Sequence, residues 1–192
     1  NIPEYENGNW WVQDYSAMLP LYLTKKIHNK KIIDMCAAPG GKLFQSLSEN
    51  ANVDIVEISK KRAELLRLNL DRLKYNNKIM LRDALEIPDD EKYDFVLIDA
   101  PCSSVGTIRR HPEIFFRTQE PDLQLLLQKQ NNLINKGKKI LKKGGTMIYM
   151  VCSFLPIETN LKIDDFLKNN SNFSIDKFNP DSKNKELVNK NG

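Results

Sequence analysis

The stretch KIIDMCAAPGGK, residues 31–42, decides the fold of this chain. It begins as a short apolar run typical of a buried strand, passes through a Pro-Gly-Gly turn, and opens a helical pattern over residues 42–49. A strand that leads through a tight turn into a helix is the first half of a βαβ unit, and such units build parallel sheets. The sequence therefore predicts an α/β fold from residue 31 onward.

The same alternation continues along the chain. We expect further strands at residues 52–58, 78–82, 93–100 and 145–152, and helices at 60–75, 123–141 and 156–168. Ser59 is a suitable N-cap for the first of these helices. Gly144 and Gly145 are expected to end the helix at 123–141. The pattern predicts a mostly parallel central sheet with helices on both faces.

The ends of the chain differ from this repeat. Residues 1–30 predict a lead-in segment, an extended piece followed by a helix that caps the domain at 31–179. Residues 172–178 predict a sixth strand, and residues 180–192 form a polar tail. A chain of 192 residues suits one domain with its own core.

Composition excludes several classes of protein. Hydrophobic residues make up 41% of the chain, which predicts a packed globule. No apolar run reaches the roughly 18 residues that cross a membrane, and the first residues carry no secretory signal. Three separated cysteines with no CxxC pair argue against a metal site and suit a reducing cytoplasm. A net charge of +4 is compatible with nucleic-acid binding without demonstrating it.

The chemically distinctive residues follow the carboxyl ends of the predicted strands, where open parallel sheets bind their ligands. In chain order they are Cys36, Ala37, Ala38, Pro39, Gly40, Gly41, Lys42, Glu57, Asp83, Asp99, Cys102 and Cys152.

The glycine turn has two interpretations. It is either a plain strand-to-helix turn or a place where a nucleotide cofactor approaches the backbone closely. The spacings of the phosphate loop and of the dinucleotide GxGxxG motif are both missing. Glu57 is either a surface acid or a partner for two ribose hydroxyls. Asp83 is an ordinary acid or lies near an adenine edge.

Cys102 and Cys152 point more sharply to chemistry. A single Cys is usually a small buried hydrophobe, but a thiolate is also the strongest side-chain nucleophile. We expect Lys42, the Arg109-Arg110 pair or a helix N-terminus to lower the pKa of such a thiol. Asp99, three residues before Cys102, suits hydrogen bonding to the polar edge of a base.

The loop Arg109-Arg110-His111-Pro112 is either a solvated basic loop, paired with acids such as Glu113 or Glu120, or a contact to RNA phosphates. His111 is not expected to act as a general base, because it precedes a proline and lacks a nearby carboxylate partner in the sequence.

Three stretches resemble a known family. DMCAAPGGK (34–42), DAPCSSVGTIRRHPE (99–113) and YMVCSFLPIETN (149–160) are similar to motifs of the Sun (Fmu) family of RNA cytosine-5 methyltransferases, and within it to the bacterial small-subunit ribosomal RNA enzymes. The resemblance extends over about residues 2–167. It implies a Rossmann-like class I methyltransferase fold, S-adenosylmethionine as cofactor and RNA, in particular ribosomal RNA, as partner. We expect a cytoplasmic monomer.

The resemblance also implies roles for single residues. Cys152 is the nucleophile and Cys102 helps to resolve the covalent adduct. From their own chemistry and position we further expect Asp99 and Lys42 to assist catalysis, and Arg109, Arg110 and His111 to bind RNA. The residues implied to bind S-adenosylmethionine are Cys36, Ala37, Ala38, Pro39, Gly40, Gly41, Lys42, Glu57, Arg62, Asp83 and Asp99.

The chain departs from the family in four places. Glu57 stands where many members have Asp, and Val151 stands where Thr usually precedes the Cys, which removes a supporting hydroxyl. The family's N-terminal RNA-binding domain and the last strand of its sheet have no counterpart in these residues. We therefore expect either a fragment or a diverged tail.

Three other functions fit parts of the pattern. A methyltransferase acting on protein, a small molecule or a base amino group needs no thiol, so loss of activity without Cys152 would argue against it. An RNA-binding module without turnover has no use for two thiols at the rim. A dehydrogenase is disfavoured by the missing GxGxxG motif.

Overall fold

The five apolar runs form one sheet in which every pairing is parallel. The computed structural model describes residues 2–24 and 26–176. The strands run in the order β3-β2-β1-β4-β5. Their bounds are Lys31–Asp34 (β1), Asn52–Glu57 (β2), Ile79–Leu81 (β3), Tyr93–Asp99 (β4) and Leu141–Met150 (β5). The predicted parallel α/β sheet is confirmed.

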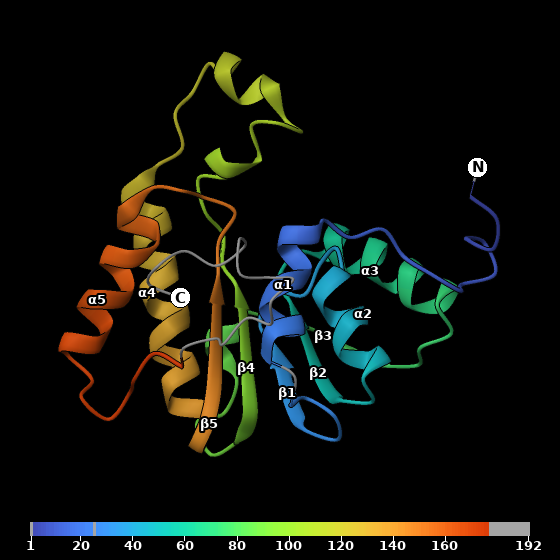
Figure 1. Cartoon of the computed structure of the whole chain (residues 1–192), viewed down its shortest axis with the longest axis horizontal. Helices are drawn as coiled ribbons and strands as arrows, with labels where there is room; N and C mark the ends of the chain where they lie inside the picture. Colours follow the sequence, from blue (N-terminus) through green and yellow to red (C-terminus); the bar gives the residue numbers. More distant parts are fainter. Residues whose placement is uncertain (1, 25, 177–192) are drawn as a thin grey trace, which may run out of the picture.

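Helices cover both faces of this sheet (Figure 1). Helices α1, α2 and α3 lie on one side, and α4 and α5 on the other. The α-helices are Tyr15–Thr24 (α1), Gly41–Ser48 (α2), Lys60–Arg72 (α3), Leu123–Ile140 (α4) and Asn160–Lys168 (α5). Short 3-10 turns are Ala84–Glu86 (η1), Val105–Thr107 (η2), Pro112–Phe116 (η3) and Pro156–Glu158 (η4).

Alternation within each strand divides the core into two layers, because successive side chains point to opposite faces. Ile32 packs in one cluster with Leu43 of α2 and Leu66 of α3. Its neighbour Ile33 packs in the other cluster with Leu133 of α4. All five side chains are buried. Burial on both faces explains why the strands read as continuous apolar runs.

The junction of α4 and β5 differs from the prediction. The helix ends at Ile140, and Leu141 already has extended backbone and pairs with Tyr93 of β4. Phe95, only two residues after Tyr93, pairs with Thr146, so β5 carries extra residues at this point. Gly144, with φ of 75°, lies inside this irregularity. The glycine pair therefore accommodates a bulge in β5 and does not end the helix.

The predicted sixth strand is wrong over its described part. Residues 172–176 form a turn and irregular backbone, and residues 177–178 lie outside the described residues. Phe173 packs edge-on against Phe166 of α5, with ring centroids 5.2 Å apart, and this contact holds the segment beside the helix. The polar tail at 180–192 also lies outside the described residues, and the boundaries at residues 30 and 179 stay predictions.

The lead-in segment runs along α2 and α3. Trp11 meets Phe44 of α2 edge-on, at 6.0 Å between ring centroids. Arg72, in the last turn of α3, donates hydrogen bonds to the carbonyls of Tyr5 and Trp10. Leu21 of α1 is buried in the same core layer as α2. Within residues 2–24 and 26–176, no helix combines the length and apolarity needed to cross a membrane.

Gly40 provides a test of the turn between β1 and α2. Its φ is 114°, and a Cβ at this position would lie 2.2 Å from the buried ring of Phe44 and 2.8 Å from Leu66. We expect Gly40→Ala to destabilise the fold by about 2 kcal/mol or more, from left-handed strain and overpacking together. Gly144→Ala is the control, because a Cβ there meets nothing within 4 Å and adds only the strain. Equal losses in melting temperature would contradict the packing argument.

Candidate active site

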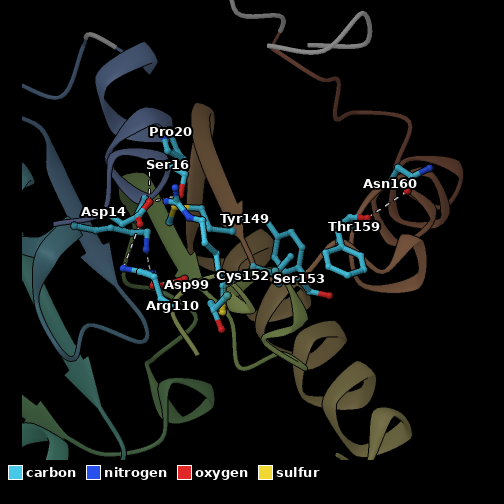
Figure 2. Close-up of a pocket in the computed structure, with 18 of the residues that line it drawn as sticks. Asp14, Ser16, Pro20, Asp99, Arg110, Tyr149, Cys152, Ser153, Thr159 and Asn160 are labelled. Carbon is cyan, nitrogen blue, oxygen red and sulfur yellow. Dashed lines mark hydrogen bonds and ion pairs between the residues drawn. The ribbon is translucent and has the colours of Figure 1, made fainter. Parts of the chain in front are cut away.

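A cavity of about 770 Å³ opens beyond the carboxyl ends of β4 and β5 (Figure 2). Five of the predicted site residues, from four parts of the chain, line this cavity: Lys42, Asp99, Arg109, Arg110 and Cys152. The remaining walls of the cavity were not predicted from the sequence. The lead-in segment contributes Asp14, Ser16, Ala17 and Pro20, and the segment from β5 to α5 contributes Tyr149, Phe154, Thr159, Asn160 and Ile163.

Lys42 and Asp99 form an ion pair at the floor of the site. Lys42 stands in the first turn of α2 and Asp99 at the end of β4, and the Nζ and Oδ2 atoms are 2.6 Å apart. Both side chains are partly shielded from solvent, so the pair is screened less than one on the surface. The lysine holds the Asp99 carboxylate in position at the wall of the cavity.

The thiols of Cys102 and Cys152 are in contact, with their Sγ atoms 3.3 Å apart. Ser104 Oγ is 3.4 Å from Cys152 Sγ. The hydrogen bond with Cys102 lowers the pKa of Cys152 to about 6, and the contact with the Ser104 hydroxyl acts in the same direction. The same hydrogen bond raises the pKa of Cys102, which keeps the shared proton. Cys152 is therefore the thiolate of the pair near neutral pH.

This result corrects the expected cause of the shift. We predicted that Lys42, the two arginines or a helix N-terminus would lower the pKa of the thiol. The shift instead comes from the neighbouring thiol and hydroxyl, while the charge of Asp99 acts in the opposite direction.

Glu57 and Arg62 lie against the glycine turn. The Glu57 side chain is only 2% exposed, and its carboxylate accepts hydrogen bonds from the backbone N–H groups of Ala38 (3.3 Å) and Ser59 (2.9 Å). Arg62 Nε is 3.6 Å from Glu57 Oε2, and the guanidinium also donates to the carbonyl of Ala38. The end of β2 and the turn after β1 are thus tied into one unit.

Two other predicted residues have local structural roles. Asp83 follows β3 and caps η1, with Oδ1 accepting from Leu85 N at 2.9 Å. Cys36 is half-buried, and burial raises the pKa of its thiol to about 12, so the thiol is not reactive. Neither residue lines the large cavity.

The basic loop is only partly as predicted. Arg109 and Arg110 line the cavity, whereas His111 does not. Arg110 pairs with Asp14 of the lead-in segment at 3.2 Å and not with Glu113 or Glu120. His111 does have a carboxylate partner, since its Nδ1 is 2.9 Å from Glu113 Oε1, which corrects the expectation from sequence.

The burial of two acids was not predicted. Asp34, at the end of β1, is 2% exposed, and burial together with the charge of Asp99 raises its pKa to about 7. Glu158, at the end of η4, is 0% exposed. An acid inside the apolar run KIIDMC was a signal for Asp34, because an isolated buried carboxylate is costly. Glu158 belongs to the motif at residues 149–160 that resembles the family, but the motif does not indicate its burial or its contacts.

Within the part of the chain that the structure describes, no group of His, Cys, Asp and Glu side chains is arranged to hold a metal ion.

Comparison with known proteins gives a consistent result. The sequence model of the family described as 16S rRNA methyltransferase RsmB/F matches residues 21–191. The curated Ribosomal RNA small subunit methyltransferase B of Photorhabdus laumondii is 36% identical over 179 residues, which are 91% of this chain and 42% of that protein. The counterpart from Yersinia enterocolitica is 37% identical over 177 residues, 89% of this chain and 41% of that protein. The chain thus spans about two fifths of the length of these relatives.

Solved structures agree. NSun6 from Pyrococcus horikoshii, solved with SFG, an S-adenosylmethionine analogue, superposes with a TM-score of 0.77 at 27% identity. The match covers 88% of this chain and 44% of that one. A methyltransferase homologue protein from Pyrococcus horikoshii has a TM-score of 0.73 at 32% identity, with 88% and 54% covered.

The thiol pair makes a prediction about reactivity. Alkylation of Cys152 by iodoacetamide should be half-maximal near pH 6. In Cys102→Ala the midpoint should rise toward the ordinary thiol value of about 8.5, because the S–H donor that stabilises the thiolate is gone. Peptide mass spectrometry across a pH series measures both midpoints, and Cys152→Ala identifies the signal. An unchanged midpoint in Cys102→Ala would show that the neighbouring thiol is not the cause.

Proposed function

Because the chain belongs to the RsmB/F family of 16S rRNA methyltransferases, we propose that it transfers a methyl group from S-adenosylmethionine to carbon 5 of a cytosine in small-subunit ribosomal RNA. The observation that carries the proposal is the pair of thiols 3.3 Å apart beside a cavity, with Cys152 poised as thiolate. Methyl transfer to a nitrogen or oxygen needs no such pair.

The residues at the ends of β1 to β4 fit the cofactor. A carboxylate offers about four acceptor positions, and the backbone contacts of Glu57 use two of them. Glu57 can therefore still accept from ribose hydroxyls, with the turn at residues 36–42 and Arg62 beside it. Asp83 would face the adenine edge, and Asp99 the amino-acid part. When bound, S-adenosylmethionine supplies the methyl group as an electrophile.

Cys152 acts first. Its thiolate adds to carbon 6 of the cytosine, forming the S–C6 bond, and the electron pair of the C5–C6 double bond makes carbon 5 nucleophilic. Asp99, positioned by Lys42, accepts a hydrogen bond from the amino group of the ring. In its protonated form it donates to N3 and so stabilises the negative charge that develops there as the thiolate adds. The base must be unstacked to reach this position.

Cys102 acts last. The proton on carbon 5 must be removed, and its electrons restore the C5–C6 double bond as Cys152 leaves as thiolate. The high pKa of Cys102 results from its contact with the Cys152 thiolate. Once Cys152 is bonded to carbon 6 that charge is gone, so the pKa of Cys102 falls and it becomes a competent base.

The proposal includes RNA as the partner, with Arg109, Arg110 and His111 beside the extruded base. It also includes a single domain over residues 31–179 that works as a cytoplasmic monomer without metal. Incubation with labelled S-adenosylmethionine and small-subunit ribosomal RNA, followed by nucleoside analysis, tests it. Label in any product other than 5-methylcytosine would reject it.

Substitution of the two cysteines should stop the reaction at different steps. Cys152→Ala should lose methylation, because no bond to carbon 6 can form. Cys102→Ala should still add to the base and remain trapped, giving a protein–RNA species that survives a denaturing gel. Since Cys102→Ala also raises the pKa of Cys152, trapping should be faster at pH 8.5 than at pH 7. The double variant is the control and should trap nothing. A trapped species in Cys152→Ala would mean that the roles are reversed.

The two arginines should also differ. For Arg109 the described residues show no ion pair, whereas Arg110 is held by Asp14. We expect Arg109→Ala to weaken RNA binding and lower the salt slope by about one phosphate contact, at unchanged melting temperature. Arg110→Ala should also release the loop from the lead-in segment and lower the melting temperature. RNA affinity at several salt concentrations, beside melting curves, measures both. An unchanged slope in Arg109→Ala would count against a phosphate contact.

A further inference from the structure

We propose that Glu158 is a positioning residue that holds the loops carrying Cys102 and Cys152 at the separation their thiols need. Its importance for turnover rests on the proposed function, but its effect on the thiol pair does not. Glu158 itself lies below the cavity and outside its lining.

The carboxylate joins three separate elements. Oε1 accepts from Ser103 N at 3.0 Å and from Gln130 Nε2 of α4 at 2.9 Å. Oε2 accepts from the Ser103 hydroxyl, which lies 3.0 Å from the hydroxyl of Ser153. Ser103 follows Cys102 and Ser153 follows Cys152, so one side chain is connected to the neighbours of both thiols.

Burial makes this arrangement stiff. Glu158 and Gln130 are 0% exposed and Ser103 is 2% exposed. Burial acts to raise the pKa of Glu158, but hydrogen bonds from Ser103, Ser153 and Gln130 outweigh it and leave the pKa below its ordinary value. The carboxylate is therefore charged, and moving either loop would leave a buried charge without its donors, which is costly.

Other contacts fix the backbone around this point. Gly106 N donates to the carbonyl of Cys152 at 3.0 Å. Gln130 Nε2 also donates to the Pro101 carbonyl, and Arg117 to the Ser103 carbonyl, both at 3.0 Å. The first bond joins the two loops, and the other two fix the backbone of the loop that carries Cys102. The Glu158 carboxylate adds the connection at the residues next to the thiols themselves.

A role of Glu158 through its charge and a role through its position predict opposite changes in the pKa of Cys152. The charged or titratable groups that line the cavity with Cys152 are Asp14, Lys42, Asp99, Arg109, Arg110 and Tyr149, and Arg117 and Asp122 line a pocket with Cys102. Glu158 lines neither and acts on the thiols from the buried side. If Glu158 acted only through its charge, removing that charge would lower the pKa of Cys152. If it acts by position, losing the connection lengthens the contact between thiols and raises that pKa.

The test measures the pH midpoint of Cys152 alkylation in three variants of the chain. Glu158→Gln removes the charge and places an amide N–H₂ against the Ser103 hydroxyl. Glu158→Asp keeps the charge but is one methylene too short to reach its donors. We expect both midpoints to rise by about one unit or more, which lowers the thiolate fraction at pH 6 several-fold. Ser103→Ala with Ser153→Ala cuts the connection at the hydroxyls and should act in the same direction.

Lys162→Met is the matched control. Lys162 of α5 is also buried, and it donates to Asn131 Oδ1 at 2.6 Å and to the Leu127 carbonyl at 3.3 Å, both in α4, rather than to either cysteine loop. This variant should lose stability and keep its midpoint near pH 6. A midpoint that stays unchanged or falls in Glu158→Gln overturns the proposal. If that variant does not fold, an unchanged midpoint in the double serine variant overturns it equally.

Methylation kinetics separate this inference from the proposed function. With RNA as substrate, Glu158→Asp should lower kcat about tenfold and leave the KM for S-adenosylmethionine unchanged. A loss expressed in that KM alone would contradict a role at the thiols. A wild-type chain that fails to methylate RNA, with the midpoint shifts intact, would refute the proposed function and leave the positioning role standing.

Discussion

Parallel pairing is the constraint on which the site depends, because it brings every strand's carboxyl end to the same edge of the sheet. The register of β4 and β5 then decides which side chains meet. Asp99 of β4 pairs with Met150 of β5. Cys102 lies three residues after Asp99, and Cys152 lies two residues after Met150. A slip of the pairing by one residue would exchange the faces of the strand and separate the thiols.

The same convergence of strand ends places three carboxylates near one another. Asp34, Glu57 and Asp99 end three adjacent strands, and two of them are almost fully buried. Lys42 and Arg62 each offset one carboxylate. Asp34 has no ion pair of its own among the described residues, and burial and the charge of Asp99 raise its pKa to about 7 although Lys42 acts in the opposite direction. Because the folded chain holds this proton more tightly than the unfolded one, Asp34 contributes a loss of stability as pH rises from about 4 through 7.

The sequence predicted features that are encoded locally. Each strand was found within a few residues because burial on both faces leaves a continuous apolar run, and the candidate residues followed from the strand ends. The start of β5 at Leu141 was missed because a positive-φ glycine suits a bulge as well as a helix end. The pairing of Asp14 with Arg110 and the contacts of Glu158 join residues far apart in the chain, and no periodicity or spacing marks such contacts.

The departure at Val151 shows how three-dimensional contacts alter a residue-by-residue reading. Val151 removes the hydroxyl that usually precedes the Cys in the family, yet Cys152 still has a hydroxyl neighbour in Ser104, 3.4 Å from its Sγ. Ser104 has a left-handed backbone with φ of 61°, a conformation that costs a non-glycine residue about 1 kcal/mol. Thr107 stabilises it, since both its backbone N–H and its hydroxyl donate to the Ser104 carbonyl, at 2.9 and 2.8 Å. The strained turn at Ser104 thus places a hydroxyl beside Cys152 that the strand itself does not provide.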